Sequence, residues 1–237
     1  MESRIAKAIK LSSQPVAVYR SKNCPEGAIQ FKENIWGCVI ALLNSASKGR
    51  TAAFCERTVA CKGGKAGLGL KKFELGTIEY FLSVGGKGPK PGEFYKKSPE
   101  LATDYINGMP DVVSEDYVVF KPLNEIQQEE PEEIVFLVNA DQLSGLVTLA
   151  NYDRQTQDSV KILFGAGCAQ AILYGLDAYN RESDACFIGL TDPSARKCIS
   201  KELLSFSIPY HRFLTMENNV SGSFLETETW AVIQNRI

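Results

Sequence analysis

The sequence predicts an α+β protein, a mixed α/β arrangement of interleaved strands and helices in a single compact domain over residues 1–237. Two observations predict this class. Short runs rich in β-branched and aromatic residues alternate with segments whose apolar residues recur at helical spacing, as expected where helices pack on a sheet. In addition, hydrophobic residues make up 44% of the 237-residue chain and charged residues 23%, which is typical of a globular protein.

The predicted strands are short apolar runs bounded by turn-forming residues. They cover 15–20, 50–55, 117–120, 133–139, 158–164, 184–190 and 203–209. Helices are predicted where apolar residues recur every three or four positions and a capping residue or a glycine marks an end. They cover 2–11, 35–49, 75–86, 98–109, 140–152, 167–181, 209–219 and 227–237. The order of elements also indicates a weak pseudo-repeat of two halves, 12–115 and 116–215.

Two segments are rich in glycine and lysine. Residues 85–97 are predicted to form a loop, because Gly, Pro and Lys dominate them. Residues 54–72, "FCERTVACKGGKAGLGLKK", contain two cysteines and a run of glycines for which no regular element is predicted. The second segment could bind a phosphate, ligate a metal or form a turn.

Composition excludes several classes of partner. The formal net charge is −2, so neither nucleic acid nor an anionic membrane is expected to bind. No apolar run approaches the roughly 20 residues that cross a bilayer. The N-terminal segment "MESRIAKAIKLSSQP" lacks the apolar core and cleavage site of a signal peptide. We therefore expect a cytoplasmic protein without a membrane or nucleic-acid partner.

Cysteine and histidine counts restrict the chemistry. There are seven cysteines, an odd number, and a reducing cytoplasm would keep them as thiols. The single histidine, His211, excludes metal sites built on two histidines and lies in no recognisable catalytic motif. Any metal would therefore be held mainly by thiolates or carboxylates.

Nucleotide-binding motifs do not fit the glycine run. A Walker A loop needs Gly-Lys-Ser/Thr at its end, but Gly69 is followed by Leu70 and Lys71. The dinucleotide fingerprint fails as well, because Lys72 stands where the third glycine would be. Anion binding by backbone amides, which the nearby lysines would favour, stays open.

Three cysteines share a local setting. Cys38, Cys61 and Cys168 each lie near a predicted helix start or next to exposed backbone amides. Such positions favour the thiolate, and thiolates on separate elements can converge on one metal or cluster. The alternative for any cysteine is a small buried apolar side chain, which the sequence favours for the remaining positions. These are Cys24, Cys55, Cys186 and Cys198.

Arg196 follows a Pro-led turn in "LTDPSARKCI". Its guanidinium could form a two-pronged contact with a carboxylate or phosphate. Alternatively, it could hold the turn in place, and the sequence leaves both roles open.

Several segments together resemble the "domain of unknown function 169" family, whose members come mainly from anaerobic bacteria and archaea. They are "QPVAVYR", "GCVIALLNSASKG", "ACKGGKAGLGL", "FGAGC", "DPSARK" and "KELLSFSIP". The resemblance implies that Cys38, Cys61 and Cys168 belong to the family pattern, together with a Gly63-Gly64 pair and Arg196. It implies no reaction, and four further cysteines in this chain depart from the pattern.

Three hypotheses follow, and none names a substrate or decides whether the protein is an enzyme. The first is an iron–sulfur cluster, or less favourably zinc, held by Cys38, Cys61 and Cys168. Three ligands would leave one coordination position open, and the partner of such a site would be a small molecule or a redox protein. The second is a metal-free module that binds a small anion through the glycine run, with Gly63 and Gly64, and Arg196. The third is a thiol-redox protein that uses Cys55 and Cys61. The first requires the three sulfurs to converge in space.

Overall fold

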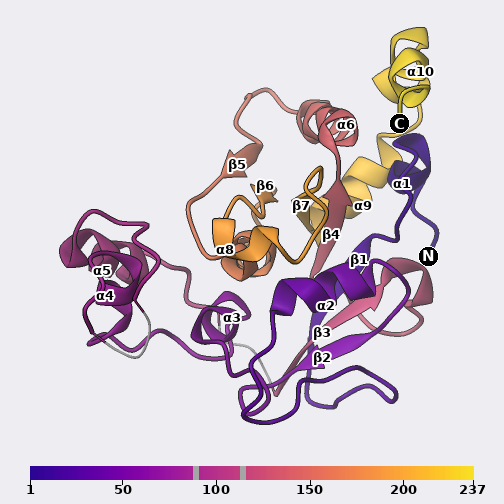
Figure 1. Ribbon diagram of the computed structural model, residues 1–237. Helices are drawn as coiled ribbons and strands as arrows, with labels where there is room; N and C mark the ends of the chain where they lie inside the picture. The colour runs from indigo at the N-terminus through magenta and orange to yellow at the C-terminus, as the bar shows by residue number, and fades with distance from the viewer. Residues whose placement is uncertain (88–90, 113–115) are drawn as a thin grey trace.

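The computed structural model describes residues 1–87, 91–112 and 116–237, and it confirms the α+β fold. Within these residues, seven strands form one mixed sheet in the order β2-β3-β1-β4-β7-β6-β5 (Figure 1). All neighbouring strands are antiparallel except β5 and β6, which are parallel. The strands are β1 (Val16–Ser21), β2 (Ala52–Phe54), β3 (Tyr117–Pro122), β4 (Glu133–Val138), β5 (Val160–Ile162), β6 (Cys186–Gly189) and β7 (Leu204–Pro209).

Helices pack on both faces of this sheet. The α-helices are α1 (Arg4–Ala8), α2 (Val39–Ala46), α3 (Lys62–Gly67), α4 (Ile78–Leu82), α5 (Pro99–Asn107), α6 (Ala140–Asn151), α7 (Tyr174–Asn180), α8 (Pro193–Arg196), α9 (Tyr210–Asn218) and α10 (Glu228–Gln234). Short 3₁₀ turns are η1 (Leu123–Glu125) and η3 (Phe224–Glu226), and a π-helix, η2 (Ala169–Leu173), leads directly into α7.

The central strand β4 divides the core into two layers. All six of its residues are buried. Because successive side chains of a strand point to opposite faces, Val135 and Leu137 contribute to one apolar cluster and Ile134 and Phe136 to the other. The first cluster packs against α2, η2, α7 and α8, and we call this side of the sheet the first face. The opposite face packs against α1, α6, α9 and α10.

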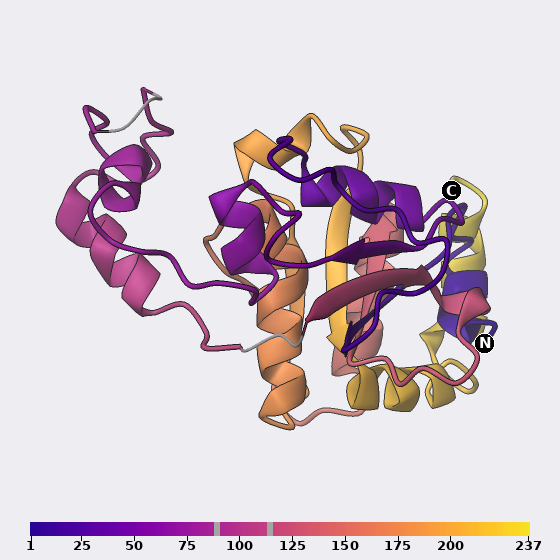
Figure 2. The same cartoon turned by 90° about the horizontal axis from the view of Figure 1, so that it is seen from below.

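Helices α4 and α5 stand away from the sheet in both views (Figures 1 and 2). Side chains connect this arm to the body of the protein. The Tyr105 ring meets the Phe164 ring edge-on at 4.9 Å, and the Lys96 ammonium lies 4.2 Å from the centre of the Phe164 ring. The Tyr95 hydroxyl donates to Asp192, the residue before α8. The arm thus contacts the segments that border the first face.

Most local predictions are confirmed within the described residues, since each predicted strand and helix overlaps an observed one. The clearest difference lies in the glycine run, where Lys62–Gly67 is helical. Residues 88–90 of the predicted loop at 85–97 lie outside the described residues. The two-half repeat stays a prediction, and β3 from the second half pairs between β1 and β2 from the first. Within the part of the chain that the structure describes, no helix has the length and apolarity to span a bilayer.

Candidate thiolate site

The three cysteines singled out in the sequence all lie near the start of a helical segment. Cys38 is the N-cap residue of α2 and Cys61 that of α3, whereas Cys168 already has helical backbone angles and lies one residue into the helix that continues as η2. An N-cap side chain lies beside the unpaired N–H groups of a helix's first turn. Cys38 and Cys61 are therefore placed beside such donors, although the Cys38 side chain forms no capping hydrogen bond.

Cys61 uses such a donor directly. The Gly64 N–H donates to Cys61 Sγ over 3.4 Å, which caps α3. Gly64 also brings α3 against the start of α2, because a Cβ atom at this position would lie 3.1 Å from Val39 Cγ2. Val39 is the neighbour of Cys38, so this contact places the Cys38 and Cys61 segments side by side.

Gly67 makes the next connection. A Cβ atom at Gly67 would lie 2.5 Å from Cys168 Cβ and 2.7 Å from the Ala169 nitrogen. Distances under 3.0 Å are not tolerated by real Cβ atoms, so only glycine permits this approach of α3 to η2. The last turn of α3 consequently rests on the Cys168 backbone.

Helix α8 packs on the other side of Cys168. The Gly167 N–H donates to Asp192 Oδ2 at 2.8 Å, and a Cβ atom at Gly167 would lie 2.6 Å from Ala195 Cβ. From α2, the Asn44 side-chain amide donates to the carbonyl of Cys198 at 3.3 Å. The contacts therefore run from α2 to α3, η2 and α8 and back to α2, and we call this arrangement the helix-end ring.

The thiols of the ring raise one another's pKa values. Burial raises the pKa of Cys168 well above its ordinary range, and the nearby Cys61 and Cys38 sulfurs raise it further. The pKa of Cys198 is raised to about 11, first by burial and then by a hydrogen bond with the Cys38 thiol. At Cys168, burial favours the neutral thiol, which is opposite to the thiolate expected from its place at a helix start.

The remaining cysteines lie elsewhere. All seven cysteines are free thiols. Cys186 is fully buried in the cluster on the opposite face of the sheet. Cys24 packs near Tyr19 in a small third cluster, and its pKa is raised by burial and then by Cys55. Of the cysteines that the sequence placed among small buried residues, Cys198 is the one that the structure brings to the helix-end ring.

The other predicted site residues have structural partners. Arg196 donates to the carbonyls of Leu190, Leu203 and Lys201, and its guanidinium thereby fastens the loop that follows β6 to the loop that precedes β7. A Cβ atom at Gly63 would lie 3.9 Å from Cys61 Sγ, an ordinary contact distance. Gly63 therefore borders the sulfur without being compressed against it.

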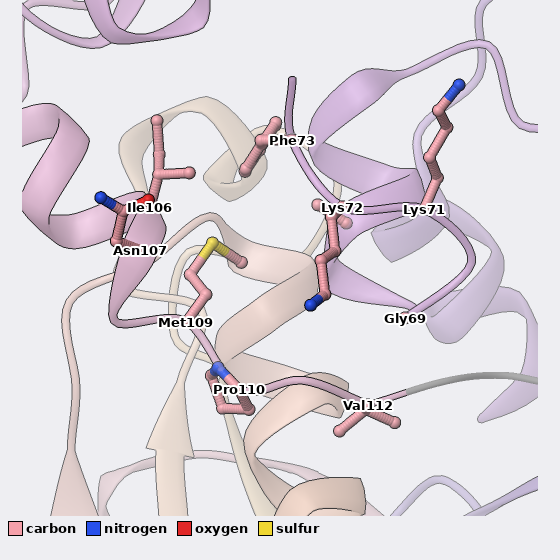
Figure 3. A pocket seen from close by; sticks show the side chains of 10 residues that line it. Gly69, Lys71, Lys72, Phe73, Ile106, Asn107, Met109, Pro110 and Val112 are labelled. Atoms are coloured by element: carbon pink, nitrogen blue, oxygen red, sulfur yellow. The ribbon is translucent and has the colours of Figure 1, made fainter. Parts of the chain in front are cut away.

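A pocket lies on the outer side of α3, between its last turn and the end of α5 (Figure 3). Its volume is about 180 Å³. Lys72 extends toward Met109 and Pro110, whereas Lys71 points away from them (Figure 3). Lys72 is paired with Asp111 at 2.7 Å, and Lys71 with Glu74 at 3.0 Å, so both charges in this pocket's lining have carboxylate partners.

Within the described residues, no three or more His, Cys, Asp or Glu side chains are grouped as the ligands of a single metal ion would be. The thiols of the helix-end ring are close enough to interact but are not gathered around one point. Sequence reasoning identified Cys38, Cys61 and Cys168. It missed Cys198 and Asp192, although both lie in the segment "TDPSARKCI" that already contained Arg196.

The fold and this site define an α+β protein that gathers cysteines from separate helix ends on one face of its sheet. The chain belongs to the DUF169 family, described as uncharacterised ArCR, whose model matches residues 4–219. This match confirms the resemblance found in the sequence. No curated protein and no solved structure matches the chain.

Proposed function

We propose that this protein binds an iron–sulfur cluster through Cys38, Cys61 and Cys168. The observation that carries the proposal is the helix-end ring, which brings these residues together across 130 positions of sequence. Core packing alone does not require three cysteines at three helix starts on the same face. Convergence of thiols from separate elements is the usual way in which a protein without a compact cysteine motif holds a cluster.

A cluster fits the arrangement better than zinc. Four sulfurs around a zinc ion lie roughly 4 Å apart, since each Zn–S bond is near 2.3 Å. No such single-ion group is present in the described residues. The sulfur ligands of a cubane cluster lie roughly 6 to 7 Å apart. Because the described residues hold no single-ion group, we propose the group with the wider sulfur spacing.

Ligation would also change the protonation of Cys168. A ligating cysteine must lose its proton, so a cluster would convert the buried Cys168 thiol into a thiolate neutralised by iron. The Gly64 amide already donates toward the Cys61 sulfur, and N–H···S contacts stabilise cluster thiolates. When bound, a cluster of this kind supplies one-electron chemistry.

The two other hypotheses have less support. Lys71 and Lys72 are paired with carboxylates and Arg196 donates to backbone carbonyls, so these three side chains already have partners other than a small anion. The Cys55 sulfur contacts the Thr58 hydroxyl at 3.5 Å, and the Cys61 sulfur accepts from Gly64. Neither contact prepares Cys55 and Cys61 to form a disulfide.

Anaerobic reconstitution with ferrous iron and sulfide tests the proposal. The loaded protein is expected to show broad absorbance near 400 nm (roughly, the thiolate-to-iron region) and to retain iron and sulfide through gel filtration. Cys61→Ser should abolish both signals. The matched control is Cys24→Ser, which lies against a separate group of buried apolar side chains and should leave both signals unchanged. A folded wild-type protein that retains no iron after reconstitution would contradict the proposal.

A further inference from the structure

The backbone around Cys198 is fixed in place from three directions. The Cys198 N–H donates to the Ala195 carbonyl at 3.0 Å, which continues the turn of α8. Its carbonyl accepts from Asn44 of α2. Arg196 ties the carbonyls on both sides of this turn to one guanidinium. A surface cysteine of a flexible loop would have none of these restraints.

The Cys198 side chain faces the helix-end ring. It is half-buried and packs, together with Cys38, against the cluster on the first face that contains Cys168. Helix α8 reaches Cys168 through the contact between Ala195 and Gly167. The Cys198 segment is thus attached to α2, which begins after Cys38, through Asn44, and to the Cys168 segment through Ala195.

The contrast with Cys186 makes this placement specific. Cys186 lies on β6, only a short distance earlier in the chain, yet its side chain is buried in the cluster on the opposite face. Cys186 is thus placed as a small apolar residue of the core. Cys38, Cys168 and Cys198 instead all contribute to the cluster on the first face, and Cys61 lies beside them at the start of α3.

We propose that Cys198 is the fourth ligand of the cluster, so that all four coordination positions are occupied by cysteine. This inference rests on the proposed function. Cys198 would fill the coordination position that three ligands leave open. A cluster with four cysteine ligands has no iron site at which substrate can bind, and such clusters transfer electrons or stabilise structure. The protein would then exchange electrons with a redox partner and would not activate a substrate at iron.

Protection from alkylation provides the first test, and it needs no variant. Wild-type protein, with and without reconstituted iron and sulfide, is treated anaerobically with N-ethylmaleimide, and the modified cysteines are mapped by mass spectrometry. Cys198 is expected to be protected in the loaded protein together with Cys38 and Cys61, whereas the buried Cys168 should react in neither sample. Cys24 should be modified equally in both samples, as an internal control.

Cluster retention in variants provides the second test. Cys198→Ser should lose iron to a chelator at least about tenfold faster than wild type, because even an indirect partner of a metal site contributes that much to retention. Cys24→Ser should match wild type. Circular dichroism of the iron-free proteins confirms that both variants fold.

The outcomes separate this inference from the proposed function. Protection of Cys38 and Cys61 with unchanged labelling of Cys198 would overturn the fourth ligand and leave the three-cysteine cluster standing. Normal retention of iron in Cys198→Ser would overturn it as well. Failure of the wild-type protein to take up iron at all would overturn the proposed function itself.

Discussion

Gly67 and Cys168 are in direct contact, although 101 positions separate them in the sequence. A Cβ atom at Gly67 would overlap both the side chain and the backbone of Cys168, at 2.5 and 2.7 Å. Backbone atoms at the start of η2 cannot move aside as a flexible side chain would. The absence of a side chain at Gly67 is therefore a condition for the helix-end ring.

Gly67→Ala is accordingly expected to destabilise the protein by about 1 to 3 kcal/mol, the usual range for forcing an extra methyl into a packed interior. It should also reduce cluster uptake, because α3 carries Cys61. Gly63→Ala in the same helix is the matched control. Its nearest contacts are 3.9 Å, and alanine favours a helix by about 1 kcal/mol over glycine. Urea unfolding of both variants gives the comparison, and equal midpoints would count against a tight contact at Gly67.

Arg196 provides a second test, this time of the loop that carries Cys198. Lysine at this position has one compact ammonium group and cannot reach three carbonyls at once. We expect Arg196→Lys to lower the free energy of unfolding by about 1.5 to 3 kcal/mol, as for lost hydrogen bonds to a charged group. Maleimide should also label Cys198 faster. Lys197→Ala, at an exposed neighbouring position, is the control. Unchanged stability and labelling in Arg196→Lys would show that these hydrogen bonds do not hold the loop.

The sequence predicted the local elements well because their signals are local. Ser98 and Pro99 begin α5 as expected, with the Leu101 N–H donating to the Ser98 hydroxyl. Helix α3 was missed for a physical reason. Three of its six residues are glycine, and each lowers helix propensity by about 1 kcal/mol. The helix forms because its glycines permit contacts with Val39 and Cys168, and those contacts exist only in the folded protein.

The site, like the local elements, was predictable only where its signals lie within a few residues of sequence. Cys38 and Cys168 could be selected because a helix start can be recognised within a few residues of sequence, and Cys61 because glycines with exposed backbone amides follow it. Cys198 follows a short helical turn, and its place at the ring depends on sheet order and on contacts from α2. Cys186, at the start of a strand, gives no sequence signal of which face it occupies. The position of β6 in the sheet decides this, and Cys186 packs on the side opposite to Cys38, Cys168 and Cys198.

The opposite face offers a test of stability that leaves the thiols untouched. The Arg212 side chain is 1% exposed, and both of its terminal nitrogens donate to the Asp153 carboxylate. This interaction holds the pKa of Asp153 below its ordinary value. The pair therefore contributes stability at neutral pH that is lost as acid protonates Asp153.

Asp153→Asn should destabilise the protein by about 3 kcal/mol at pH 7, because it leaves the buried Arg212 charge without its carboxylate. The matched control is Asp177→Asn, whose partner Arg181 is 69% exposed. Exposed pairs of this kind contribute only about 0.5 kcal/mol. Thermal unfolding at pH 7 distinguishes the two variants. A similar small effect in both would mean that the Arg212 interaction is as weak as a surface pair.

Glu133 is the most unusual carboxyl group in the core. It lies on β4, is fully buried beneath α7, and neither carboxyl oxygen has a hydrogen-bond partner within the described residues. A Cβ atom at Gly175 would lie 1.8 Å from Glu133 Oε1, so glycine is required above it. Burial raises the pKa of Glu133 well above its ordinary value, so the folded protein holds this proton more tightly than the unfolded chain does.

This raised pKa makes stability depend on pH in a defined direction. Above the ordinary value of 4.5, the unfolded chain releases the Glu133 proton and the folded protein does not, so stability falls as the pH rises. The loss amounts to at most about 1.4 kcal/mol per pH unit. Glu133→Gln, which keeps the shape and cannot ionise, should therefore gain stability relative to wild type as the pH rises from 5 to 8, by at most about 1.4 kcal/mol per pH unit. The exposed Glu130→Gln should show no such gain. Urea unfolding of the three proteins at both pH values measures the difference, and a constant offset between Glu133→Gln and wild type would mean that Glu133 ionises normally in the folded state.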